Sequence, residues 1–136
     1  MDVHSPVQRS YNMSRIKDKD TRPEVVTRHW LWRNGYRYRL HCKDLPGKPD
    51  IVFRKQKKVI FVHGCFWHKH NCDYFHWPQT NTDFWKQKIL TNVKRDENIY
   101  SELETKGWHY LIIWECQLRR DNLDSTWNKI TAFLSY

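Results

Sequence analysis

The spacing of apolar and polar residues predicts one helix and then three short strands in the first half of the chain. Thr21 followed by Glu24 three positions later is a capping box, and Pro23 between them fits the first turn of a helix. The helix is expected to end at Asn34-Gly35. Strands are then expected over residues 36–40, 50–53 and 59–62, the last two forming a hairpin.

The second half of the chain begins with a longer helical pattern. An inward-facing stripe with spacings of 4, 3, 4 and 3 residues runs along a helix expected from about 82 to 106, through Ile89, Val93, Asp96, Tyr100 and Leu103. An apolar strand over 108–114, expected to be buried on both faces, and a helix over 123–134 follow. The order α-β-β-β-α-β-α predicts a single α/β domain with a central mixed β-sheet flanked by helices.

The positive charge of the chain is concentrated at one end. Residues 1–60 hold 15 Lys and Arg against 6 Asp and Glu, whereas the remaining residues hold 9 of each, so the net charge of +9 arises in the first part. Residues 1–20, which have few apolar positions, are expected to form a basic arm, and residues 21–136 are expected to form the domain. With 8 Trp and 7 Tyr, this balance indicates a nucleic-acid partner. The alternative is a soluble basic protein without one.

Residues 63–72, with the sequence HGCFWHKHNC, concentrate the ligand types that zinc prefers. No segment has the pattern of a signal peptide or a membrane span, so a cytoplasmic location is expected and the four cysteines are interpreted as metal ligands rather than as disulfides. A closed zinc site takes four ligands, which we assign to Cys65, His70, Cys72 and Cys116. Cys42 stands apart as a bystander thiol. The alternative for this segment is a zinc knuckle whose aromatic residues only fill its small core.

Asp96 is the one charged residue in the inward-facing stripe of the long helix. Burying an isolated carboxylate is prohibitive, so Asp96 needs a partner. A histidine suits this role, since the carboxylate would fix its tautomer and leave the second ring nitrogen as a base. The alternative is a structural salt bridge to an arginine of the first helix.

Asp50 directly follows Pro49 at the start of a predicted strand. A Pro-Asp step at this place is typical of nucleases with a PD-(D/E)xK core, in which a second strand supplies an acidic residue and a lysine. Here the corresponding positions of the second strand are Phe61 and His63. The hairpin would nevertheless bring Asp50 next to the histidine-rich segment.

Taken together, these motifs resemble the very short patch repair (Vsr) family of mismatch endonucleases. The resemblance rests above all on LPGKPD at residues 45–50 and HGCFWHKHNC at residues 63–72. It extends to YNMSRI at residues 11–16, DFW at residues 83–85, NVKRD at residues 92–96 and WEC at residues 114–116. It therefore covers nearly the whole chain, and implies a restriction-endonuclease-like PD-(D/E)xK core with a structural zinc site.

The resemblance implies an endonuclease that cuts one strand beside the thymine of a T:G mismatch, the product of 5-methylcytosine deamination. Asp50 would bind catalytic Mg²⁺, with help from the backbone carbonyl of Val62 and, through water, from Glu24. A familiar member of the family has threonine at the place of Val62, and a carbonyl contact would tolerate that difference. His68 would be the general base oriented by Asp96, and His63 would lie beside the scissile phosphate.

The resemblance also implies DNA contacts and partners. Aromatic wedges near the mismatch would be Phe66, Trp67 and Trp85, the arm with Met13 would grip the opposite side, and Lys88 and Asn92 would reach bases or phosphates. The partners implied are double-stranded DNA, a cytosine-5 methyltransferase in a functional association and mismatch-repair proteins. We expect a bacterial monomer, associated with the nucleoid when bound to DNA. The alternatives are a restriction endonuclease cutting both strands and a non-catalytic zinc-containing DNA-binding module.

Overall fold

The computed structural model describes residues 20–73 and 75–136, which build a four-stranded mixed sheet in the order β1-β2-β3-β4. β1 (Arg39–Leu40) pairs antiparallel with β2 (Ile51–Phe53), and β2 pairs antiparallel with β3 (Lys58–His63). β3 runs parallel to β4 (His109–Trp114). The predicted mixed sheet is confirmed. Residues 1–19 of the predicted arm, with Met13, lie outside the described residues.

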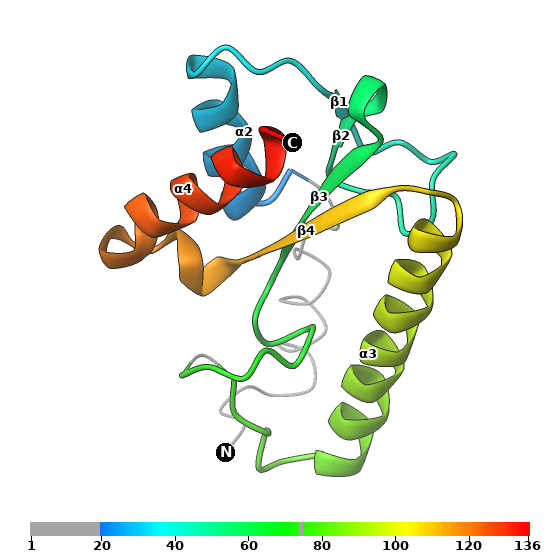
Figure 1. The fold of residues 1–136 in the computed structure, drawn as a ribbon. Helices are drawn as coiled ribbons and strands as arrows, with labels where there is room; N and C mark the ends of the chain where they lie inside the picture. Colours follow the sequence, from blue (N-terminus) through cyan, green and yellow to red (C-terminus); the bar gives the residue numbers. More distant parts are fainter. Residues whose placement is uncertain (1–19, 74) are drawn as a thin grey trace.

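Helices cover both faces of the sheet (Figure 1). α2 (Arg22–Arg33) and α4 (Leu123–Leu134) pack on one face, and α3 (Thr82–Thr105) packs on the other. Short 3₁₀ turns lie at Arg54–Gln56, Glu115–Leu118 and Arg120–Asn122. None of the helices in the described part of the chain combines the length and the apolar character that crossing a bilayer requires. The predicted order of helices and strands is confirmed.

The core is divided by the alternation of side chains along the central strands. Towards α2 and α4, the buried cluster consists of Leu31, Ile51, Phe53, Ile60, Val62, Ile113, Ile130, Phe133 and Leu134. Towards α3, the cluster consists of Leu45, Val52, Val59, Phe61 and Leu103. Burial of these faces supplies the main driving force for folding, and it fixes which side chains point to α3.

Two expectations about strands are corrected by the structure. The strand predicted over 36–40 is reduced to Arg39–Leu40, because Tyr36 N–H donates to Leu31 O and so continues the end of α2. The strand over 108–114 is not buried on both faces, since only Ile113 in β4 is fully buried. β4 is the edge of the sheet, and its apolar sequence reflects partial cover by helices rather than a central position.

The loop before β2 is shaped by Gly47. This residue has φ +76°, and a Cβ atom there would lie 2.7 Å from Ile99 Cγ2 on α3, so both the backbone conformation and the close approach require glycine. The loop therefore lies directly against the long helix. It ends with Pro49, which is fully buried, and thereby fixes the place where Asp50 enters the sheet.

The parallel pairing of β3 with β4 brings two distant segments together at the carboxyl ends of these strands. α3 is the crossover between these strands, and the register sets His63 opposite Trp114. The histidine-rich segment follows the carboxyl end of β3, and Cys116 follows the carboxyl end of β4. The residues predicted to carry chemistry consequently converge there.

Candidate active site

Asp50 and Glu24 form a pair of largely buried carboxylates. Their side chains are 15% and 5% exposed. Burial, and next the charge of Glu24, raise the pKa of Asp50 to about 8, although a hydrogen bond of 2.7 Å from Val62 N–H to Asp50 Oδ2 opposes that rise. Two acidic groups held together in this way make a site in which a divalent cation would relieve the repulsion.

Glu24 reaches this place because of the helix start. Thr21 caps α2 by accepting from Glu24 N–H at 3.5 Å, which confirms the predicted capping residue. The carboxylate of Glu24, however, accepts from Asp20 N–H at 2.9 Å. In a full capping box the Glu24 carboxylate would accept from Thr21 N–H, but here it accepts from the residue before the cap, Asp20. The Glu24 side chain is buried.

The backbone of Val62 faces Asp50, while its side chain does not. The Val62 side chain belongs to the core cluster on the α2 and α4 face. Its N–H donates to Asp50, and in an extended strand the N–H and C=O of one residue lie on the same side. Valine at this position therefore packs in the core through its side chain, while its backbone faces the carboxylate pair.

His63, His68 and Asp96 form a second cluster, which is linked to the first through β3, because Val62, the residue before His63, donates to Asp50. The rings of His63 and His68 stack with centroids 3.7 Å apart and planes at 10°. Asp96 Oδ2 lies 2.5 Å from His68 Nδ1, which donates its proton to the carboxylate and leaves Nε2 as the second nitrogen. The predicted histidine partner of Asp96 is confirmed, and the alternative of an arginine from the first helix is excluded.

His63 is held in a neutral state by its surroundings. Burial, and next the charge of His68, lower the pKa of His63 to about 3. Its Nε2 shares a hydrogen bond of 2.8 Å with the hydroxyl of Tyr100, whose pKa is raised by burial. At neutral pH His63 can therefore donate or accept one hydrogen bond in a fixed orientation, but it does not carry charge.

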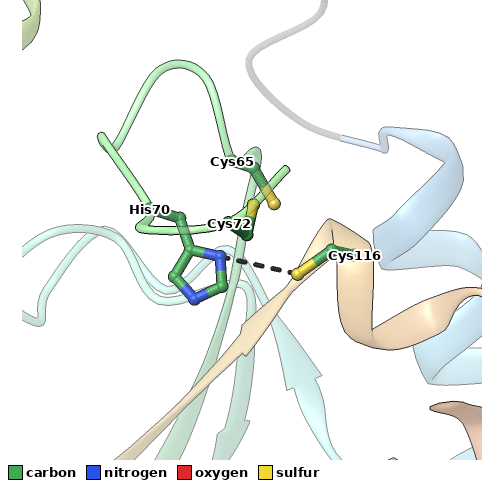
Figure 2. Close-up of side chains that lie close together, drawn as sticks. All are labelled: Cys65, His70, Cys72 and Cys116. Atoms are coloured by element: carbon green, nitrogen blue, oxygen red, sulfur yellow. Dashed lines mark hydrogen bonds between the residues drawn. The ribbon is translucent and has the colours of Figure 1, made fainter. Parts of the chain in front are cut away.

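Four predicted zinc ligands converge in the structure (Figure 2). Their ligand atoms all lie within 4.8 Å of one another, and Cys116 Sγ is 3.5 Å from His70 Nδ1; the set is Cys65, His70, Cys72 and Cys116. Cys42 is not a member of the cluster, as predicted. The loop after β3 supplies three of these side chains, and the turn after β4 supplies the fourth.

The donor set fits a soft divalent cation. Burial raises the pKa of the Cys65 thiol to about 12, so its thiolate requires a compensating positive charge. Burial also lowers the pKa of His70, which keeps the imidazole in the neutral form that binds metals. Three thiols and one imidazole at this spacing match the donor set of tetrahedral structural zinc sites.

The predicted aromatic wedges lie together on the loop and on α3. Trp67 packs on Trp85 with ring centroids 5.8 Å apart, and Phe66 packs on both at 5.3 and 5.6 Å. Trp85 is only 8% exposed, whereas the other two rings are half-buried. Neighbouring Phe84, which sequence reasoning did not select, is 51% exposed.

Lys88 and Asn92 hold the loop that carries these rings. Asn92 Nδ2 donates to Trp67 O at 3.2 Å, and Lys88 Nζ lies 5.7 Å from the centre of the Trp67 ring. Both residues come from α3, one helical turn apart. They therefore lie beside Trp67, and their contact with DNA stays a prediction.

Comparison with known proteins identifies the family. Residues 1–74, which include both the LPGKPD and the HGCFWHKHNC motifs, match the family model of the DNA mismatch endonuclease Vsr. The chain belongs to the Vsr family of DNA mismatch endonucleases. The resemblance found in the sequence is thus confirmed, and the chain is a DNA endonuclease by family.

Relatives support the assignment over most of the chain. The DNA mismatch endonuclease Vsr of Escherichia coli K12 is 46% identical over 118 residues, which is 87% of this chain and 76% of that protein. The type II nicking enzyme V.NmeAIP of Neisseria meningitidis is also 46% identical over 118 residues, with 87% and 84% covered. The type II nicking enzyme V.XorIIP of Xanthomonas oryzae is 46% identical over 114 residues, with 84% of each chain covered.

Within this Vsr-family chain, two site residues escaped sequence reasoning. His41 lies beside the carboxylate pair, with Nε2 3.4 Å from Asp20 Oδ1 and 3.5 Å from Glu24 Oε2. Tyr100 was placed in the helical stripe only as an apolar residue, and it hydrogen-bonds His63. A pairing of Leu40 with Ile51 in the expected sheet would have pointed to His41, since the next pair is His41 with Asp50.

Proposed function

We propose that this Vsr-family enzyme nicks one DNA strand beside the thymine of T:G mismatches that arise from 5-methylcytosine deamination. The reaction is a Mg²⁺-dependent hydrolysis of one phosphodiester bond that leaves a 5′ phosphate. The observation that carries the proposal is that one end of β3 holds both groups: Val62 N–H bonds Asp50 of the buried carboxylate pair, and the next residue, His63, stacks on His68 of the His68–Asp96 dyad. In this proposal, residues 21–136 form a restriction-endonuclease-like PD-(D/E)xK core, and residues 1–20 form an arm that grips DNA.

Three groups would hold the cation. Asp50 would be the direct carboxylate ligand, the Val62 carbonyl would lie beside it, and Glu24 would act through water. The fit is supported by the raised pKa of Asp50, because a cation at that point stabilises the ionised carboxylate. A bound Mg²⁺ would supply charge neutralisation of the phosphate and stabilisation of the leaving 3′ oxygen.

His68 would act as the general base. Asp96 fixes Nδ1–H, so Nε2 can take a proton from the attacking water, and the carboxylate would stabilise the imidazolium that results. His63 would contact the scissile phosphate as a neutral hydrogen-bonding group oriented by Tyr100. The stacking of the two rings supports this assignment, because it holds the proposed base beside the proposed phosphate contact.

Zn²⁺ on Cys65, His70, Cys72 and Cys116 would have a structural role. It would join the loop after β3 to the turn after β4, and so fix the positions of His63, His68 and the aromatic residues between them. Because the wedge residues lie between ligands in the sequence, the loop cannot shift without disturbing this site.

Phe66 and Trp67 would enter the duplex near the mismatch, with Trp85 behind them, while Met13 of the arm would contact the opposite side. Unstacking a base step costs a few kcal/mol, and a weakly paired T:G site lowers that cost. Lys88 and Asn92, which already contact Trp67, would reach the neighbouring bases or phosphates.

The proposed partners follow from the substrate and from the relatives. Relatives named as type II nicking enzymes support a functional association with a cytosine-5 methyltransferase. We also propose that the enzyme acts as a monomer in the bacterial cytoplasm, on nucleoid DNA, with assistance from mismatch-repair proteins.

A nicking assay tests the proposal. T:G duplexes with varied flanking bases, matched methylated duplex and matched unmethylated duplex are incubated with the zinc-loaded protein, with and without Mg²⁺. We expect a single-strand nick beside the thymine in T:G duplex only, and only with Mg²⁺. Double-strand cleavage of methylated matched DNA would favour a restriction endonuclease, and binding without cleavage would favour a non-catalytic module.

The His68–Asp96 pair should act as one unit. His68→Ala and Asp96→Ala are each expected to slow single-turnover nicking by about 10²–10⁴-fold, the range for loss of acid–base catalysis. The double variant should be little slower than His68→Ala, since the orienting residue then has nothing to orient. Asp96→Asn should keep DNA affinity near normal. Full multiplication of the two losses would show that Asp96 acts separately.

Trp67→Ala should weaken binding to T:G duplex more than binding to matched duplex. Stacking of a base on an aromatic ring is worth about 1–3 kcal/mol, and insertion is easiest where pairing is weak. Fluorescence anisotropy with both duplexes, alongside the melting temperature, measures the effect, and Trp32→Ala on the outer part of α2 is a matched control with its exposed ring. An equal loss on both duplexes with a lowered melting temperature would instead identify Trp67 as a core residue of the loop.

A further inference from the structure

His41 is brought to the carboxylate pair by the register of the sheet. Leu40 pairs with Ile51, and the pairing continues as His41 N–H donates to Asp50 O at 3.3 Å. The backbone of His41 has φ +49°, in the left-handed region, which residues other than glycine adopt only at an energetic cost. The backbone of His41 is thus held in an unusual conformation opposite the proposed metal ligand.

Both ring nitrogens of His41 face carboxylate oxygens. Nε2 is 3.4 Å from Asp20 Oδ1 and 3.5 Å from Glu24 Oε2, and Nδ1 is 4.0 Å from Asp50 Oδ1. On the Nε2 side, ligand atoms of Asp20, Glu24 and His41 all lie within 4.8 Å of one another, whereas Asp50 approaches Nδ1. Ligands around one divalent ion, bound at about 2.1 Å each, stand about 3–4 Å apart. The 4.0 Å between His41 Nδ1 and Asp50 Oδ1 falls in that range.

The charge balance also leaves room for a cation. Asp20 has its own partner, because Arg28 Nη1 lies 2.8 Å from Asp20 Oδ1. Glu24 and Asp50 are more deeply buried than Asp20, and in the part of the chain that the structure describes the basic side chain within 4.0 Å of both is His41. A single imidazole cannot balance two buried carboxylates, so a metal ion bound between His41 Nδ1 and Asp50 would add the positive charge that this site needs.

We propose that His41 Nδ1 is a direct ligand of the divalent cation held by Asp50, so that this site binds Mn²⁺, or another first-row transition ion, more tightly than the Mg²⁺ of the proposed reaction. The inference rests on the proposed metal site at Asp50. Imidazole is a common ligand of transition ions, whereas Mg²⁺ favours oxygen ligands and water. His41 therefore changes an all-oxygen site into a mixed nitrogen–oxygen site.

Pulsed electron paramagnetic resonance on Mn²⁺ tests this inference without relying on cleavage. Mn²⁺ is added to the zinc-loaded protein, and coupling of the ion to ¹⁴N is measured. We expect nitrogen coupling in the wild type, its replacement by ¹⁵N coupling after labelling with ¹⁵N-histidine, and its loss in His41→Gln. His29→Gln, which changes an exposed histidine of the same region, should retain it. The isotope label identifies a histidine ligand even if His41→Gln folds poorly.

Affinities provide the second readout. His41→Gln should weaken Mn²⁺ binding by about tenfold or more, and Mg²⁺ binding by less. Absence of nitrogen coupling in wild type that binds Mn²⁺ through Asp50, or its persistence in His41→Gln, would overturn the role of His41. Mn²⁺ binding that survives Asp50→Asn unchanged would instead overturn the proposed metal site itself, so the two failures are distinguishable.

Discussion

Asp50→Ala is expected to reduce magnesium-dependent nicking by about a thousandfold or more while leaving mismatch binding largely intact. A metal ion contributes several kcal/mol to transition-state stabilisation in phosphoryl chemistry, and each 1.36 kcal/mol is a factor of about ten. Asp50 is the carboxylate that accepts from the backbone of β3 next to His63. Single-turnover cleavage of a T:G duplex measures the loss.

The matched control is Asp44→Ala. This carboxylate lies in the same loop region, is 63% exposed and pairs with Arg54 at 2.7 Å, so its removal should leave nicking almost unchanged. Substantial cleavage by Asp50→Ala, at wild-type zinc content, would contradict the assignment of Asp50 as the ligand.

The same residue should couple stability to pH in protein free of Mg²⁺. The pKa of Asp50 is raised from 3.8 to about 8 by burial and by Glu24, so the folded chain retains a proton that the unfolded chain loses at lower pH. The contribution of Asp50 to stability therefore falls as the pH rises from about 4 to about 8. Asp50→Asn removes this dependence, and its melting temperature should exceed that of the wild type increasingly towards pH 8.

Cys116→Ser is expected to abolish zinc binding and to lower the melting temperature sharply. The binding free energy of a structural zinc is about 10–16 kcal/mol in small zinc domains, as large as the whole stability of many folds. Cys116 is the ligand that comes from the far side of the α3 crossover, so without it the metal no longer joins the two segments. Metal analysis and thermal denaturation measure both effects.

Cys42→Ser is the control for the loss of a thiol. Cys42 is half-buried against the core cluster that faces α3 and is not part of the metal-binding group. Only a small change in melting temperature is expected, with full zinc content. Equal zinc in Cys116→Ser and wild type would show that another residue completes the site.

Sequence patterns predicted those features that depend on residue spacing within one segment or on the chemistry of the ligand side chains. The stripe along α3 placed Asp96 inward and so predicted its histidine partner, which the structure identifies as His68. The capping residue Thr21 predicted the start of α2, and the ligand types of the histidine-rich segment predicted the cluster with Cys116. Each of these features depends on the spacing within one segment or on donor chemistry.

Features that depend on sheet register were not predicted. His41 contacts the carboxylate pair only because Leu40 pairs with Ile51, and no local pattern specifies that pairing. The edge position of β4 likewise depends on strand order rather than on its own apolar sequence. The deep burial of Trp85 is set by the loop packed over it, which has no periodic signal.

The crossover between β3 and β4 also bears on when, during synthesis, the protein could become active. The ribosome releases the Asp50 hairpin and the histidine-rich loop first, but Asp96 and then Cys116 emerge only after most of α3 and all of β4 have been translated. Parallel pairing of this kind requires closure of a long loop before its contacts form. A nascent chain therefore holds the histidines without their orienting carboxylate or the last thiol, and the ribosome-bound fragment should bind DNA through its basic residues without cutting it.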